Sequence, residues 1–281
     1  MRVAIIGNND GPERLAGSLR RGGHEVVFCG RQRGAGPQEP SYGEESSLRT
    51  ALAPLDFDLL LNCFANFRFR HLLDEVDCLN VHLAPLPRYR GRHPLRWALI
   101  NGETEFGATL HRMNAEFDAG AILWQRLVPV GTDWSARQLR EALFATVETE
   151  LPAVLHEYAA GRLRELPNDD RLATNVTRRS PTDSLLDARD WADHARLRRK
   201  VMALREDDHP AVLLTADGAR YPLSAARPGV RTFVGFGRPV TVGRRERAIE
   251  VVCADGATLW LSLAPAAPPP PPPNTPLNIP Q

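Results

Sequence analysis

The N-terminal residues alternate between apolar and polar runs that predict a strand, a helix and a second strand. Residues 3–6 are apolar and are followed by a glycine, as expected for a short buried strand. Over 13–21, Leu15 and Leu19 lie four residues apart and share one helical face, and residues 25–29 are apolar again. A unit of this kind joins parallel strands through a right-handed crossover. The N-terminal part of the chain therefore predicts a parallel sheet.

Beyond this unit the apolar pattern continues in the same way. It predicts strands over 58–64, 78–82, 107–113 and 121–130, a short helical stretch near 70–75 and a surface loop over 31–46. Pro94 can open a helix as its first residue, with Trp97 and Ile100 facing inward. Apolar residues recur at helical spacing over 139–158, and Pro152 inside that run should kink or split the helix.

The pattern changes after a polar linker at 167–170. From 171 to 264 the apolar runs are short, and the turn pairs Asp217-Gly218 and Asp255-Gly256 favour β-hairpins between them. One helix is predicted in this region. Residues 265–281 contain six consecutive prolines and are predicted to be polyproline II or disordered.

These elements define an α/β fold class with three parts. We expect a Rossmann-like parallel-sheet domain over 1–166, a smaller C-terminal β-rich domain over 171–264 and a proline-rich tail over 265–281. A length of 281 residues suits two domains. The 35 basic and 34 acidic residues leave a net charge of +1, whereas a dedicated nucleic-acid binder usually carries a basic excess.

Composition also limits metal, redox and membrane functions. The four cysteines form no CxxC pair, which favours reduced, buried thiols, so no metal site is predicted. No segment approaches the roughly 20 apolar residues that span a bilayer, and the N-terminal apolar run is too short for a signal peptide. We therefore expect a cytoplasmic protein without a membrane partner.

Polar side chains that could carry chemistry lie at the end of the predicted strand 78–82. Asn80 and His82 are two residues apart and point to one face of that strand, at the carboxyl end where open α/β sheets bind ligands. Asp118 follows in a predicted turn. An amide can stabilise an oxyanion, an imidazole can move a proton and a carboxylate can orient the imidazole, which suits acyl transfer. On spacing alone, each of the three also has an ordinary structural explanation.

The segments around these residues resemble a known family. Residues 79–91, LNVHLAPLPRYRG, are similar to the formyltransferase signature of Asn-x-His followed by Leu-Pro-x-Tyr-Arg-Gly. Blocks at 97–103, 107–113 and 117–123 follow in the family's order and at similar spacing, and 178–184 resembles its lead into a C-terminal β domain. The family includes methionyl-tRNA formyltransferase, glycinamide ribonucleotide transformylase, formyltetrahydrofolate deformylase and amino-sugar N-formyltransferases.

The resemblance implies a reaction and a role for each of the three side chains. The chain would move a formyl group from the co-substrate 10-formyltetrahydrofolate to a primary amine. Asn80 would hydrogen-bond the formyl oxygen as it becomes an oxyanion, and His82 would shuttle a proton. Asp118 would hold His82 and favour its imidazolium form.

The resemblance also implies where the donor binds. The loop after the predicted strand 58–64, with Phe64, Asn66 and Phe67, matches the place where the family grips the pterin through main-chain groups. The opposite wall would be the loop at 114–119. Phe64 and Phe67 fit equally well as core residues.

The acceptor amine is not fixed by the sequence. Segments 91–95 and 112–118 resemble the amino-sugar enzymes, which favours a nucleotide-linked amino sugar or a similar biosynthetic amine. Methionyl-tRNA is the alternative, but tRNA requires positive surface and a net charge of +1 does not favour it. A third hypothesis is a non-catalytic module that binds folate or nucleotide, and the presence of Asn80, His82 and Asp118 argues against it. Homodimer formation is left open.

Other suggestive features have simpler interpretations. The turn Gly7–Gly11 lacks the G-x-G-x-x-G pattern, so no nicotinamide site is predicted. His93 and His111 could join the site, although a strand face is the simpler position for His111. The basic run at 196–200 could meet phosphates, but such a run is more often the solvated face of a helix.

Overall fold

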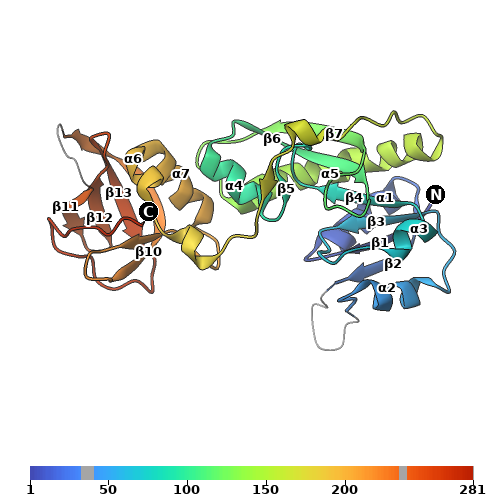
Figure 1. The fold of residues 1–281 in the computed structure, drawn as a ribbon, viewed down its shortest axis with the longest axis horizontal. Helices are drawn as coiled ribbons and strands as arrows, with labels where there is room; N and C mark the ends of the chain where they lie inside the picture. Colours follow the sequence, from blue (N-terminus) through green and yellow to red (C-terminus); the bar gives the residue numbers. More distant parts are fainter. Residues whose placement is uncertain (33–40, 234–238, 281) are drawn as a thin grey trace. The chain divides into compact units, whose positions relative to one another are not determined.

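The computed structural model describes residues 1–32, 41–233 and 239–280, so the predicted loop at 31–46 lies partly outside the described residues. The chain divides into two compact units (Figure 1). The first comprises Met1–Pro94, Glu105–Pro129 and Arg140–Val176, and the second comprises Leu95–Thr104, Val130–Leu139 and Thr177–Gln281. Two short segments thus group with the second unit although they precede the predicted linker.

A six-stranded sheet forms the centre of the first unit, with the strand order β2-β1-β3-β4-β6-β7. Its strands are β1 (Arg2–Gly7), β2 (Glu25–Arg31), β3 (Leu59–Cys63), β4 (Cys78–His82), β6 (Glu105–Arg112) and β7 (Ile122–Pro129). Strands β1 to β4 run parallel, whereas β6 and β7 are antiparallel to their neighbours. The predicted α/β class is therefore confirmed.

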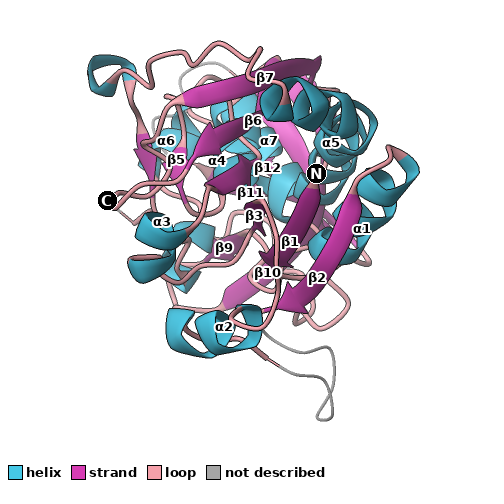
Figure 2. Cartoon of the chain, turned by 90° about the vertical axis from the view of Figure 1, so that its right-hand side faces the viewer, coloured by secondary structure: helices cyan, strands magenta, loops and turns pink. Residues whose placement is uncertain are grey.

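Helices cover both faces of this sheet. Figure 2 shows α1 (Gly11–Arg21) and α5 (Ala136–Ala159) on one side and α2 (Glu45–Leu52) and α3 (His71–Glu75) on the other. Alternate strand residues supply the two cores, because successive side chains of a strand point to opposite faces. Ile6 packs with α2 and α3 in one fully buried cluster.

Pro152 lies inside α5, which nevertheless continues unbroken to Ala159. Of the two expected effects of Pro152, a kink or a split, the split is therefore wrong. Proline has no N–H group for the carbonyl of Glu148, and the hydroxyl of Ser18 on α1 donates a hydrogen bond to that carbonyl instead. In the described ranges neither α5 nor another helix has the length and apolarity needed to cross a membrane.

An antiparallel five-stranded sheet forms the core of the second unit, in the order β11-β12-β13-β10-β9. Its strands are β9 (Val212–Leu214), β10 (Arg220–Thr232), β11 (Val240–Arg245), β12 (Ala248–Val252) and β13 (Ala257–Leu263). The two predicted hairpins, β9–β10 and β12–β13, are confirmed. The remaining elements of the chain are β5 (Arg90–Gly91), α4 (Pro94–Asn101), a 3-10 turn (Asp170–Leu172), β8 (Asn175–Val176), a second 3-10 turn (Pro181–Ser184), α6 (Ala188–Ala192) and α7 (His194–Leu204).

The proline-rich tail joins the two edge strands of this second sheet. The N–H of Asn274 donates to the carbonyl of Thr241 in β11, at 2.7 Å, and the N–H of Asn278 donates to the carbonyl of Leu214 in β9, at 2.8 Å. Leu277 also pairs with the residue that follows β9. Strands β11 and β9 stand at opposite ends of the strand order, so the tail covers both edges of the sheet.

Candidate active site

The end of β4 presents two of the predicted side chains. Asn80 and His82 are each about 8% exposed, and both lie on the strand face that the alternation predicts. Strand β4 stands between β3 and β6, and β3 and β4 are parallel with their carboxyl ends together. This is the edge of an α/β sheet at which ligands bind.

Asp118 comes to this edge from the turn between β6 and β7. Its backbone is left-handed, with φ of 55°. Asn168 donates hydrogen bonds to the carbonyls of Asp118, at 2.8 Å, and of Gly120, at 2.9 Å. A Cβ at Gly120 would come within 2.0 Å of the Arg112 carbonyl oxygen, so only glycine allows the turn to lie so close to β6.

The structure brings Asn80, His82 and Asp118 together. Oδ1 of Asp118 is 3.5 Å from Nδ1 of His82 and accepts from Nδ2 of Asn80 at 3.3 Å. Its second oxygen, Oδ2, accepts from the backbone N–H of Gly91 at 2.9 Å. Nε2 of His82 lies 2.9 Å from the carbonyl oxygen of Tyr89. Both ring nitrogens of His82 thus face oxygen atoms.

The site holds a fixed negative charge at Asp118. Burial alone would raise the pKa of this carboxyl group, because it disfavours the charged form. Interactions with His82 and His111 and the N–H of Gly91 outweigh burial and hold the pKa of Asp118 well below its ordinary range. The carboxylate is therefore ionised at neutral pH and can orient and charge an imidazole.

His111 belongs to the same cluster, one of the two positions that the sequence left open for it. It is about 2% exposed and pairs with Asn80 across β4 and β6. Its Nε2 lies 2.9 Å from Nδ2 of Asn80 and 3.5 Å from Oδ1 of Asp118. Both descriptions hold, because the strand face that carries His111 is the face of the site.

The side chains of the predicted pterin loop diverge. Phe64 has φ of 73°, and its ring lies 5.8 Å from the ring of Phe144 on α5. Phe67 lies 4.7 Å from Phe69 and packs against the core beneath α2 and α3. Asn66 is exposed, and its N–H donates to the side chain of Gln32 at 2.8 Å. The two phenylalanines therefore lie on opposite sides of the sheet.

The loop that we expected to face this segment does approach it. The guanidinium carbon of Arg68 lies 5.5 Å from the ring centre of Phe117, which is about 50% exposed. This contact joins the segment after β3 to the segment before Asp118. Both lie at the carboxyl edge described above, so the two predicted walls of the donor site are neighbours.

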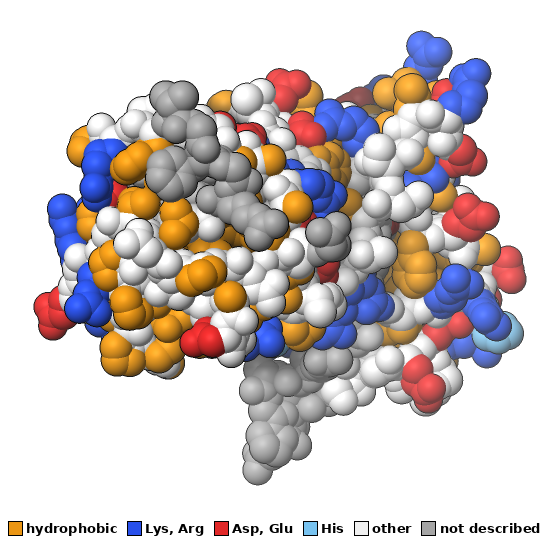
Figure 3. All heavy atoms as spheres, turned by 60° about the vertical axis from the view of Figure 1, so that its left-hand side comes forward, with side chains coloured by type: hydrophobic (Ala, Val, Ile, Leu, Met, Phe, Trp, Pro, Cys, Tyr) orange, Lys and Arg blue, Asp and Glu red, His pale blue; other side chains and the backbone are white. Residues whose placement is uncertain are grey.

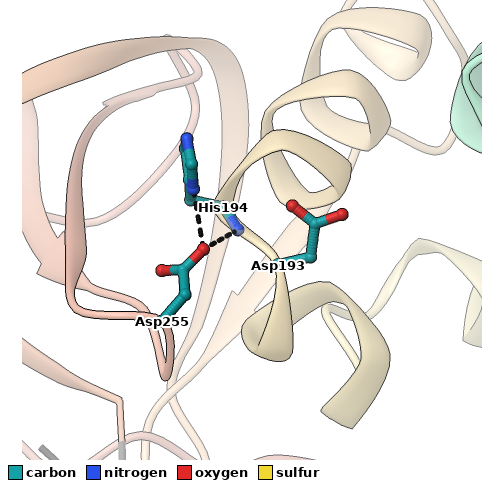
Figure 4. A group of neighbouring side chains, drawn as sticks. All are labelled: Asp193, His194 and Asp255. Atoms are coloured by element: carbon teal, nitrogen blue, oxygen red, sulfur yellow. Dashed lines mark hydrogen bonds and ion pairs between the residues drawn. The ribbon is translucent and has the colours of Figure 1, made fainter.

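Among the described residues, Asp193, His194 and Asp255 have ligand atoms close enough to hold a metal ion (Figure 4). Each carboxylate already has a structural role. Asp193 accepts from the N–H of Ala195 at the start of α7, and Asp255 accepts from the backbone N–H and Nδ1 of His194 at 3.0 and 2.7 Å. The group is explained as a helix start joined to a hairpin, far along the chain from Asn80.

The basic run on α7 is neutralised by carboxylates. Arg196 and Lys200 both contact Asp190, at 3.1 and 2.6 Å, and Arg198 pairs with Asp133. Basic and acidic side chains are also interspersed on the face of the molecule drawn in Figure 3. The run is therefore paired within the protein rather than free for phosphates, and it is not the solvated face that we expected, because Lys200 is buried.

A central sheet with polar side chains at its carboxyl edge is typical of α/β proteins that bind and convert small molecules. The sequence over 2–155 matches the formyl transferase family, and this match covers more than half of the 281 residues. The chain belongs to the formyl transferase family.

Solved structures share the fold over nearly the whole chain. HypX from Aquifex aeolicus in complex with tetrahydrofolic acid aligns with a TM-score of 0.67 and 20% identity, covering 93% of this chain and 43% of HypX. The N-formyltransferase from Helicobacter canadensis in complex with folinic acid and dTDP-3-aminofucose gives 0.66 and 14%, covering 94% and 99%. WlaRD, a sugar 3N-formyl transferase with dTDP and 5-N-formyl-THF, gives 0.65 and 15%, covering 94% and 98%. The chain spans less than half the length of HypX.

Proposed function

We propose that this chain transfers a formyl group from 10-formyltetrahydrofolate to a primary amine of a small molecule, most simply a nucleotide-linked amino sugar. The observation that carries the proposal is the cluster of Asn80, His82 and Asp118 at the carboxyl edge of β4. Nδ2 of Asn80 and Nδ1 of His82 lie 3.3 and 3.5 Å from the same oxygen, Oδ1 of Asp118. Family membership supplies the reaction type, and the cluster supplies groups suited to it.

In the proposed reaction the amine nitrogen attacks the formyl carbon, and the carbonyl oxygen becomes an oxyanion. The N–H₂ group of Asn80 exchanges its 3.3 Å bond to Asp118 for a bond to that oxyanion. His82 takes a proton from the attacking nitrogen and delivers one to N10 of the folate as the carbon–N10 bond breaks. The products are a formamide and tetrahydrofolate, so atoms and charge balance. Asp118 stabilises His82 while it carries the extra proton.

Two observations support a small amine over tRNA. The basic run on α7 is paired with carboxylates, so it offers little free positive charge to a phosphate backbone. The Helicobacter canadensis structure, which shares this fold over 94% of the chain, holds folinic acid and dTDP-3-aminofucose. We extend that donor and acceptor chemistry to this chain, and we expect the reaction to take place in the cytoplasm.

A competition experiment tests the acceptor. The protein is mixed with 10-formyltetrahydrofolate, a panel of nucleotide-linked amino sugars and methionyl-tRNA, and mass spectrometry records which amine gains 28 Da, about the mass added when a formyl group replaces hydrogen. We expect a sugar nucleotide to be formylated. Formylation of the tRNA alone would show that the acceptor assignment is wrong. Absence of donor turnover with every amine tested would favour a non-catalytic binding module.

The His82→Ala variant tests the mechanism. Loss of a positioned acid–base group should lower kcat by about 10²- to 10⁴-fold. His209→Ala, which removes an imidazole at an exposed position, is the matched control and should keep native turnover. Thermal unfolding of both variants checks that the fold is retained. Native kcat in a folded His82→Ala protein would contradict the proposed role of His82.

A further inference from the structure

Strand β3 has a polar residue at its second-last position, after a fully apolar start. Asn62 is about 5% exposed and follows Leu59, Leu60 and Leu61, which are fully buried. A buried carboxamide without partners is costly, because its donors and acceptors lose their bonds to water. Asn62 must therefore be bonded within the protein, and its partners reveal what it does.

Asn62 is the first of three polar residues that stand side by side on neighbouring strands. The strand register pairs Asn62 with Asn80 across β3 and β4, and pairs Asn80 with His111 across β4 and β6. Nδ2 of Asn62 donates to Oδ1 of Asn80 at 2.9 Å, and Nδ2 of Asn80 lies 2.9 Å from Nε2 of His111. The three side chains form one hydrogen-bonded row through the site.

Backbone groups at both ends set the direction of this row. The N–H of Ala65, which can only donate, bonds Oδ1 of Asn62 at 3.1 Å. The carbonyl of Arg112, which can only accept, lies 2.7 Å from Nδ1 of His111 and calls for a proton there. Asn62 must then present its N–H₂ group to the oxygen of Asn80, and a proton at Nδ1 of His111 leaves Nε2 able to accept. Asn80 is left with its N–H₂ group on the side of His111 and Asp118.

We propose that Asn62 is a positioning residue that fixes which end of the Asn80 carboxamide faces the reacting formyl group. The inference rests on the proposed function, in which Asn80 must offer N–H donors to an oxyanion. A carboxamide can rotate by about 180° with little change in shape, which exchanges its oxygen and its N–H₂ group. The rotated amide would present an oxygen to the oxyanion. Asn62 opposes this rotation, because it would set the N–H₂ groups of Asn62 and Asn80 against each other.

The same side chain ties Asn80 to the segment expected to bind the donor. Besides accepting from the N–H of Ala65, Asn62 donates to the carbonyl of Ala65 at 3.3 Å. Ala65 lies between Phe64 and Asn66, which are predicted to contact the pterin. Asn62 thus sets the position of the oxyanion donor relative to the segment that would hold the folate.

The Asn62→Leu variant tests this role, because leucine has a similar volume and suits the apolar strand but makes no hydrogen bond. We expect kcat to fall by about 10- to 100-fold, somewhat less than for loss of an oxyanion donor. Asn8→Leu is the matched control. Asn8 donates to the carbonyl of Phe64 at 2.9 Å, so it braces the same segment without touching Asn80, and its loss should act on the donor KM rather than on kcat.

A double-mutant cycle with Asn80→Ala shows whether Asn62 acts through Asn80. If it does, Asn62→Leu should change kcat by less than about twofold once the Asn80 carboxamide is absent. An equal loss of kcat in both backgrounds would overturn the proposal, as would native kcat in a folded Asn62→Leu protein. Thermal unfolding of each variant provides the check of the fold.

A nuclear magnetic resonance measurement separates this inference from the proposed function. In the native protein the side-chain N–H₂ of Asn80, assigned by its loss in Asn80→Ala, should show an Overhauser contact to the two ring protons that flank Nε2 of His111, on Cδ2 and Cε1. The contact should weaken in Asn62→Leu and persist in Asn8→Leu. Its full retention in Asn62→Leu would overturn the positioning role even if no acceptor amine is found, whereas failure of the competition experiment alone would count against the proposed function.

Discussion

At the scale of single residues, Asp118 depends on contacts from several parts of the first unit. Its left-handed backbone is sparsely populated for residues other than glycine and costs about 1 kcal/mol or more. Asn168 bonds the main chain of the turn, while the N–H of Gly91 and the imidazoles of His82 and His111 approach the carboxylate. The unfavourable backbone is thus retained where it fixes a charge between two histidines.

The low pKa of Asp118 predicts how stability depends on pH. A carboxyl whose pKa is lower in the folded than in the unfolded chain stabilises the fold above its unfolded pKa of about 4 and loses that contribution as pH falls toward the folded pKa. Asp118→Asn lacks this contribution. The difference in free energy of unfolding between the native protein and Asp118→Asn should therefore shrink below pH 4, by at most about 1.4 kcal/mol per pH unit.

Urea unfolding at a series of pH values measures this difference. Asp208→Asn, at an exposed position, controls for the loss of one surface carboxyl group. A difference between native protein and Asp118→Asn that stays constant from pH 6 to pH 3 would show that the carboxylate is not stabilised by its neighbours.

The residues of the site differ in how far the sequence could predict them. Asn80 and His82 follow from strand alternation, and Asp118 from resemblance to the formyltransferases. Asn62 and His111 could not be found in this way, because their place beside Asn80 depends on the register between strands, which no local pattern encodes. Asn62 gave a weaker signal as a polar residue in an otherwise apolar strand, whereas the strand of His111 also contains Glu105, Thr109 and Arg112.

At the scale of elements, α5 shows how a proline is accommodated inside a helix. Ser18 supplies the donor that Pro152 lacks, and the close approach of α1 depends on Gly22. A Cβ at Gly22 would lie 2.3 Å from the Cβ of Pro152. The proline is therefore a packing residue as well as an interruption of the hydrogen-bond ladder.

Ser18→Ala should lower the free energy of unfolding by about 1–3 kcal/mol, because the Glu148 carbonyl loses its hydrogen bond in a part-buried place. In the Pro152→Ala background Ser18→Ala should lower the free energy of unfolding by less, since alanine restores an N–H group that donates a hydrogen bond to this carbonyl. Denaturant unfolding of the four proteins gives the coupling. Equal costs of Ser18→Ala in the two backgrounds would show that the serine does not compensate for the proline.

Prolines also explain why the full extent of β10 was not predicted. Pro222 and Pro228 lie within this strand, and proline in an apolar run argues against a strand because it cannot donate to the ladder. Pro222 pairs with the short edge strand β9, and the register shifts after Pro228. Both prolines thus occupy an edge pairing or an irregularity, the places where sheets tolerate them. The hairpins at Asp217-Gly218 and Asp255-Gly256 were predictable because turn residues act locally.

At the scale of the whole molecule, the chain returns at its end to complete the second sheet. We expected the tail to be polyproline II or disordered, yet residues 274–278 hydrogen-bond to both β11 and β9. The hydroxyl of Thr241 donates to the carbonyl of Pro272 at 3.0 Å and accepts from the N–H of Thr275 at 2.9 Å. Exposed sheet edges favour association with other chains, and the tail covers two of them.

Deletion of 265–281 should therefore lower the melting temperature of the second unit and promote self-association through the uncovered edges. Calorimetry and sedimentation measure the two effects. Pro269→Ala, which changes one exposed proline and leaves the hydrogen bonds of the tail in place, is the control. A truncated protein with native melting behaviour and unchanged sedimentation would mean that the tail contributes nothing to the sheet.

Residues 274–278 contact both edge strands of the second sheet, β11 and β9. A single cut by a protease among these residues would therefore release both strands. Digestion of this unit should then proceed as one event, with the intact species giving way to small fragments and few long-lived products between them. A fusion partner attached after Gln281 would pull on the same residues, so a reporter is better placed ahead of Met1.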